Sequence, residues 1–171
     1  MDMKEGKYLT FSLGKEEYGI PILKVKEIIG MMEITPIPKT PIFVQGVINL
    51  RGKIIPIIDL RLKFSLEKKE YTERTCIIVV DIESGETKRQ VGVAVDAVSE
   101  VVNIQKDAIE EPPEYDEEGS EEFLTGIGKL ENKVVMLLNT DKVLNFKGIT
   151  NMDLLNNQDR GDSNVKKYKS K

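Results

Sequence analysis

The sequence predicts an all-β protein with short helices, built from two similar β units. In residues 44–60, two runs rich in Val and Ile flank the pair Arg51-Gly52. This is typical of a β-hairpin, because β-branched residues suit a pleated surface and glycine accepts a positive φ. The pattern returns eighty positions later, in residues 124–139, with Glu131-Asn132 at the turn. The other apolar runs are short and separated by Gly, Pro and polar residues, as expected for strands.

A second pair of segments favours an internal duplication. Residues 18–28 and 91–101 share the same order of an apolar-Gly-apolar run, then Val, Glu and an aliphatic residue. Chance likeness between Gly-punctuated strands is the alternative, but order, spacing and turn positions agree together. We therefore predict a single domain over residues 1–150, with halves at roughly 15–80 and 81–146 plus the N-terminal strand.

The N-terminal part predicts a strand at residues 8–13, which pairs with residues 17–21 through a turn at Gly14-Lys15. Residues 22–26 follow Pro21, a residue suited to the first position of a helix, and they predict one helical turn.

The next segment, residues 27–34, is ambiguous between helix and strand. We assign it to a strand, because its repeat counterpart around residues 101–104 is poor helix material. Three prolines make residues 35–41 an extended loop, which is either a spacer or a stiff rim beside a binding surface.

The first hairpin has a charged tip. Its apolar arms are expected to be buried, while Asn49, Arg51 and Lys53 face solvent. Gly52 supplies the turn geometry. Pro56 lacks an N–H, so we expect it at an edge or a bulge.

After this hairpin, residues 61–65 predict a helical turn and residues 66–74 a charged, solvated segment. Residues 75–82 read as a strand buried on both faces, and residues 89–98 as the next strand.

The C-terminal part contains an acidic stretch at residues 110–122. A metal site there is conceivable, but no ligand spacing recommends one, and a solvated loop is favoured. Asn139 or Thr140 can cap a short helix at residues 141–146. Residues 151–171 form a polar tail, which we expect to be disordered.

Composition excludes several classes of function. The 171 residues contain no histidine, which removes His-based catalysis and most zinc sites. The net charge of −4 argues against nucleic acid as a partner. Residues 126–129 resemble the end of a phosphate-binding loop, but Leu130 stands where Ser or Thr should bind magnesium. We predict no enzyme, no catalytic residue, no metal and no cofactor.

The location is predicted from what the chain lacks. We expect no signal peptide and no membrane insertion, since no apolar run is long enough to span a bilayer. The single thiol, Cys76, cannot form an internal disulfide, which fits a reducing cytoplasm.

Taken together, these motifs resemble the CheW family, the coupling proteins of bacterial chemotaxis. The resemblance covers roughly residues 7–146 and is specific only in combination. It is carried by residues 16–28, 46–52, 56–60, 91–98 and 123–126.

This resemblance implies two interleaved five-stranded SH3-like β-barrels around a shared core. It also implies a non-catalytic adaptor that joins the helical-bundle tips of chemoreceptors to the histidine kinase CheA. The kinase's regulatory domain has the same fold, so the two are expected to pair. The adaptor is expected to be a monomer in isolation and to assemble into receptor arrays. A scaffold of the same fold in a different kinase or motility system is the alternative.

Carried over by position, the resemblance implies a receptor-binding surface, with Gly92 and Val101 on a strand beside it and no residue assigned to the kinase. A groove with aliphatic walls and an arginine at one end can receive a helix, with Gly46 allowing close approach. Plain core packing explains the three aliphatic residues equally well. The receptor-binding set is Val25, Glu27, Ile28, Gly46, Arg51 and Val98.

Overall fold

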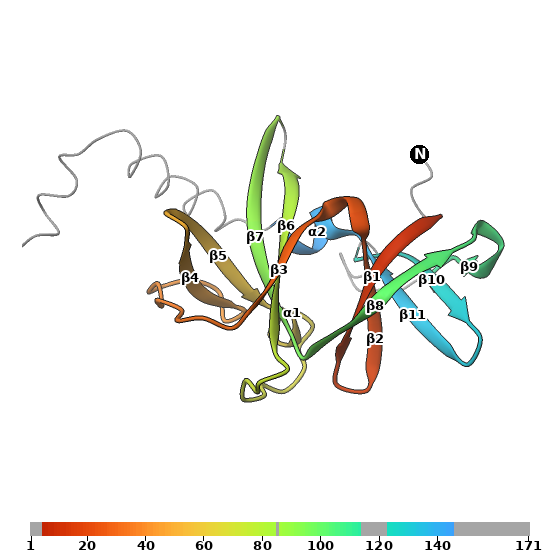
Figure 1. The fold of residues 1–171 in the computed structure, drawn as a ribbon, viewed down its shortest axis with the longest axis horizontal. Helices are drawn as coiled ribbons and strands as arrows, with labels where there is room; N and C mark the ends of the chain where they lie inside the picture. The colour runs from red at the N-terminus through yellow and green to blue at the C-terminus, as the bar shows by residue number, and fades with distance from the viewer. Residues whose placement is uncertain (1–4, 85, 114–122, 146–171) are drawn as a thin grey trace, which may run out of the picture.

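The computed structural model describes residues 5–84, 86–113 and 123–145 and confirms the all-β prediction (Figure 1). The six-stranded sheet has the order β8-β1-β2-β11-β10-β9, and the five-stranded sheet has the order β3-β6-β7-β5-β4. The strands of the first are β1 (Gly6–Leu13), β2 (Glu16–Pro21), β8 (Ala97–Ile104), β9 (Ile109–Glu110), β10 (Leu124–Leu130) and β11 (Lys133–Leu138). Those of the second are β3 (Val25–Gly30), β4 (Val44–Leu50), β5 (Lys53–Asp59), β6 (Cys76–Ser84) and β7 (Thr87–Val95). The short helices are η1 (Ile22–Lys24), α1 (Leu60–Lys63), η2 (Lys106–Ala108) and α2 (Thr140–Leu144).

The two sheets repeat each other strand for strand, as a duplication requires. In chain order, β1 to β5 and α1 correspond to β6, β7, β8, β10, β11 and α2. Replacing each strand of the five-stranded sheet by its counterpart gives the order of the six-stranded sheet, apart from β9. The helix caps repeat too: Asp59 and Asn139 each accept a hydrogen bond from a backbone N–H in the first turn of their helix.

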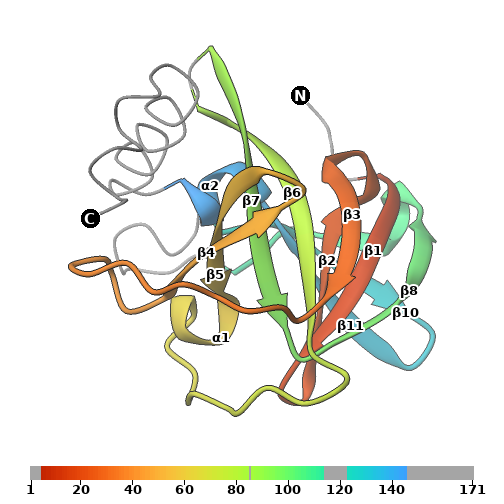
Figure 2. The same cartoon turned by 60° about the vertical axis from the view of Figure 1, so that its left-hand side comes forward.

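The repeats are interleaved, because each gives its first two strands to the sheet that the other completes. β2 pairs in parallel with β11, and β7 pairs in parallel with β5. Figure 2 shows the β1–β2 hairpin lying with β8, β10 and β11, far from it in sequence. The sheets therefore divide the chain differently from the predicted halves: one is built from residues 25–95, the other from segments on both sides of them.

The largest hydrophobic core is shared by both sheets. It contains Phe11 and Ile20 from the six-stranded sheet, and Ile58 and Val93 from the five-stranded sheet, all 1% exposed or less. Each sheet also encloses a smaller cluster of its own. Gly92 allows close packing where β5 and β7 meet, since a Cβ there would lie 2.5 Å from Cδ1 of Ile57 and would force that side chain to shift.

Most of the predicted local elements are found. β6 is buried on both faces, η1 provides the expected helical turn, and Asn139 caps α2. The ambiguous residues 27–34 are a strand only as far as Gly30. The predicted tail, most of the acidic stretch and Phe146 lie outside the described residues.

Pro56 corrects one expectation. It does not lie in an edge strand, because β5 has β7 on one side and β4 on the other. It does not lie at the register shift of this hairpin either, which falls between Val44 and Gly46. The register explains how it is tolerated. Pro56 is opposite Val47 of β4, and the ladder with β7 begins only at Ile57, so the missing N–H falls where no β7 partner is present.

Thr140 gives a first testable prediction. It is 4% exposed, its hydroxyl has no hydrogen-bond partner among the described residues, and it lines a hollow that is otherwise apolar. Its repeat counterpart is the apolar Leu60. Replacing the hydroxyl by a methyl group in Thr140→Val should therefore raise the free energy of unfolding by about 1 kcal/mol. Urea titration measures this; a loss of stability would mean that the hydroxyl bonds to buried water.

Candidate functional site

The tip of the β4–β5 hairpin is a two-residue turn with an unusual backbone. Arg51 has φ 53° and Gly52 has φ 88°, and positive φ at both central residues is the signature of a type I′ turn. The side-chain Oδ1 of Asn49 accepts a hydrogen bond of 2.8 Å from the Gly52 N–H. Asn49, Arg51 and Lys53 are all exposed, as predicted. The turn thus places the Arg51 side chain at the surface.

Arg51 has a partner within the chain, which sequence reasoning missed. Its guanidinium donates to the carboxylate of Glu27 on β3, so two residues of the predicted receptor-binding set are in direct contact. The Arg51 side chain is 69% exposed and that of Glu27 is 33% exposed. A pair this open to solvent contributes at most about 1 kcal/mol to stability. Its main effect is to orient both side chains next to β3.

β3 contributes two aliphatic residues of the predicted set in different environments. Ile28 is 44% exposed, one of the larger apolar side chains that face solvent. Val25 is half-buried and packs against the shared core. Val98 also packs against that core, but it comes from β8 of the six-stranded sheet. Ile28 is therefore available to a partner, while core packing accounts for much of Val25 and Val98.

Gly46 lies apart from the charged pair and has a different surrounding from the one expected. It is buried, with φ 138°, at a register shift between β4 and β5. A Cβ at this position would lie 2.1 Å from the carbonyl oxygen of Thr35. Thr35 forms a two-hydrogen-bond bridge with Val47, next to Gly46. The close approach is thus made by the chain itself, from the proline-rich loop.

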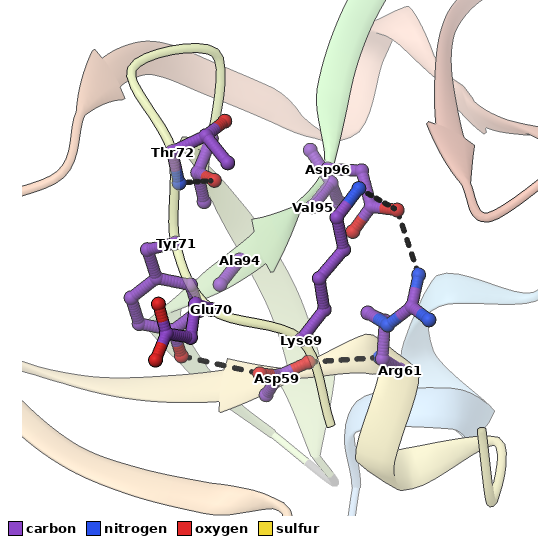
Figure 3. Close-up of a pocket in the computed structure, with 10 residues that line it drawn as sticks. Asp59, Arg61, Lys69, Glu70, Tyr71, Thr72, Ala94, Val95 and Asp96 are labelled. Atoms are coloured by element: carbon purple, nitrogen blue, oxygen red, sulfur yellow. Dashed lines mark hydrogen bonds and ion pairs between the residues drawn. The ribbon is translucent and has the colours of Figure 1, made fainter. Parts of the chain in front are cut away.

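A polar network under the segment of residues 66–74 was not predicted (Figure 3). Asp59 is 2% exposed, caps α1, and accepts a 3.1 Å hydrogen bond from the hydroxyl of Tyr71. Burial raises the pKa of Tyr71, and the charge of Asp59 and this hydrogen bond raise it further. The phenol therefore stays protonated and acts as a donor. The sequence predicted only a charged, solvated segment around Tyr71.

The same network contains an ion pair between Arg61 and Asp96 at 2.7 Å, drawn in Figure 3. Both side chains are nearly buried, at 15% and 14% exposure. They are 35 residues apart, so no local spacing signals the contact.

Two kinds of feature are absent from the part of the chain that the structure describes. In residues 5–84, 86–113 and 123–145, no group of three His, Cys, Asp or Glu side chains is placed to hold a metal ion. No helix in this part of the chain has the length and apolar character to cross a membrane. The surface of this part presents a charged pair and, on the same edge strand, an exposed aliphatic side chain, and both kinds of group are suited to binding another protein.

The regions that match known proteins span both repeats. Residues 7–147 match the family described as the CheW-like domain. The chemotaxis protein CheW of Klebsiella aerogenes is 42% identical over 147 residues, which is 86% of each chain. The crystal structure of scaffolding protein TtCheW from Thermoanaerobacter tengcongensis superposes with a TM-score of 0.74 and 37% identity, over 84% of this chain and 95% of that one. Protein FrzA of Myxococcus xanthus is 30% identical over 82% of this chain and 86% of its own.

Proposed function

The chain belongs to the CheW-like domain family, and from this membership we propose that it is a non-catalytic adaptor in chemotaxis. It joins the cytoplasmic tips of chemoreceptors to the regulatory domain of the histidine kinase CheA. It works in the cytoplasm without a cofactor, is a monomer on its own, and assembles into receptor arrays. Its relatives named chemotaxis protein and scaffolding protein support this role.

The observation that carries the proposal is the contact of Arg51 with Glu27, together with the exposed Ile28 on the same edge strand, β3. A receptor tip is a helical bundle, and a helix with an aliphatic stripe and a carboxylate matches this surface. Ile28 would be buried by the stripe. Arg51 has five N–H donors, so it can bind a second carboxylate while it keeps Glu27.

One relative favours keeping a second candidate function. Protein FrzA matches most of this chain but is not named a chemotaxis protein. We therefore keep a scaffold of the same fold in a different kinase or motility system as the alternative proposal. Binding to receptor tips of the source cell separates the two roles, because only the chemotaxis adaptor requires it.

NMR titration of the labelled protein tests the proposal. A receptor-tip fragment should shift the amide signals of Glu27, Ile28 and Arg51. The CheA regulatory domain should bind at the same time and shift a different set of signals. Absence of binding to both partners at millimolar concentration would contradict the chemotaxis role, and competition between them would contradict separate surfaces.

We also expect the purified protein to hydrolyse no ATP and to contain no stoichiometric metal. The basis is the absence of histidine from the sequence, together with a phosphate-loop-like segment that lacks its Ser or Thr. Elemental analysis and a coupled ATPase assay check this. Hydrolysis that persists through two different purification schemes would overturn it.

A further inference from the structure

Two ion pairs occupy equivalent places in the two repeats, with opposite polarity. Arg61, the second residue of α1, binds Asp96, which is the single residue between β7 and β8. Asp141, the second residue of α2, binds Lys24 at 3.0 Å, and Lys24 is the last residue before β3. Asp141 lies eighty positions after Arg61, the same offset that relates the two hairpins. Each pair thus joins a helix to the residue that directly precedes a strand.

The first pair lies where the chain passes from one sheet to the other. β7 belongs to the five-stranded sheet and β8 to the six-stranded sheet. The Asp96 carboxylate accepts from Arg61 and also, at 2.7 Å, from the backbone N–H of Gly14 in the β1–β2 turn. The Asp96 N–H donates to the carbonyl of Ser12. One residue therefore ties α1, the β1–β2 hairpin and the sheet crossover together.

The second pair makes a matching connection. The chain passes from β2 of the six-stranded sheet to β3 of the five-stranded sheet through η1, which ends at Lys24. Both carboxylate oxygens of Asp141 accept from Lys24, and Oδ1 also accepts from the N–H of Glu83 at the end of β6. The two crossovers between the sheets are thus both held by an ion pair to a helix.

The strands that leave these crossovers carry the predicted receptor-binding residues. Val25, Glu27 and Ile28 follow Lys24 directly on β3, and Val98 follows Asp96 by two residues on β8. We propose that the Arg61–Asp96 and Lys24–Asp141 pairs are clamps that fix the relative orientation of the two sheets. They thereby position the β3 and β8 parts of one receptor-binding surface, an inference that rests on the proposed function.

Two measurements on the same variants test the clamps. Residual dipolar couplings, fitted separately for the amides of each sheet in the free protein, report the angle between the sheets. NMR titration with a receptor-tip fragment reports affinity. Arg61→Leu should remain folded, change the angle between the sheets, and weaken receptor binding about tenfold, as expected when part of an interface is misplaced.

The opposite polarity of the second clamp allows a rescue. Asp141→Lys places two lysines together and should reproduce the effects of Arg61→Leu. The double variant Lys24→Asp with Asp141→Lys restores the ion pair but leaves the Glu83 N–H without its side-chain acceptor, so it should recover most of the angle and the affinity that Asp141→Lys loses. Because this clamp is more exposed, at 23% and 35%, these variants should fold even where Arg61→Leu does not.

Tyr71→Phe is the matched control. It removes the hydrogen bond to Asp59, which lies in the same polar network but joins two segments between residues 25 and 95. It should lower the melting temperature while leaving the angle and the affinity unchanged. A folded Arg61→Leu or Asp141→Lys variant that kept the wild-type angle between the sheets, or the wild-type affinity for the receptor fragment, would contradict the clamp proposal. It would leave the proposed function untouched. Failure of the wild-type protein to bind the receptor fragment would instead refute the proposed function, and the positioning role with it.

Discussion

Gly46→Ala is expected to lower the free energy of unfolding by about 3 kcal/mol or more, the combined size of backbone strain and overpacking. The position has φ 138°, a region that residues with a Cβ rarely adopt. The new methyl group would also lie 2.1 Å from the carbonyl oxygen of Thr35 and 2.9 Å from the Cα of Pro36. Both are backbone atoms, so no rotamer change relieves the clash. The bridge between Thr35 and Val47 must open.

Gly30→Ala is the control in the same sheet. Gly30 ends β3, and a Cβ there would have no atom within 4 Å. The substitution should change stability by less than about 0.5 kcal/mol. Urea denaturation of both variants measures the difference as a shift in the midpoint. Equal midpoints for Gly46→Ala and the wild type would show that the proline-rich loop yields freely and that its bridge to β4 contributes little.

The sequence predicted the hairpins because their signals are local. Runs rich in Val and Ile on both sides of the turn Arg51-Gly52 predict a two-residue hairpin without reference to the rest of the chain. The repeat of this pattern predicted the duplication. Pro56 was misassigned because its tolerance depends on where β7 begins to pair with β5, and local sequence does not contain that register.

The interactions that build the site could not be predicted in the same way. Glu27 and Arg51 are 24 residues apart, and Arg61 and Asp96 are 35 apart, so each contact depends on how the sheets are arranged. The exchange of the first two strands between the repeats was expected from the family resemblance alone, since in local sequence either sheet offers those strands a similar apolar edge. Gly46 shows the limit most clearly: its need for glycine was evident, but the group that approaches it is Thr35 rather than a partner.

Arg51→Glu should leave the protein folded and able to bind the kinase domain, yet reduce receptor-tip affinity by about a hundredfold or more. Its side chain is 69% exposed, so the loss of the pair with Glu27 should cost about 1 kcal/mol or less of stability. If Arg51 binds a receptor carboxylate, as proposed, reversal replaces this attraction by repulsion, which costs several kcal/mol. NMR titration and urea denaturation of the same sample measure the two effects. The claim would fail if the variant bound the receptor fragment as tightly as the wild type.

The charge swap Glu27→Arg with Arg51→Glu decides why the affinity falls. It restores an ion pair between β3 and the hairpin tip, but the positive charge now lies on β3. If Arg51 itself binds a receptor carboxylate, the swapped protein should regain the stability lost in Arg51→Glu and remain weak in receptor binding. If the intramolecular pair only holds the surface in shape, both stability and affinity should return. Recovery of affinity would therefore assign Arg51 an orienting role within the chain, and continued weakness would place it in contact with the receptor.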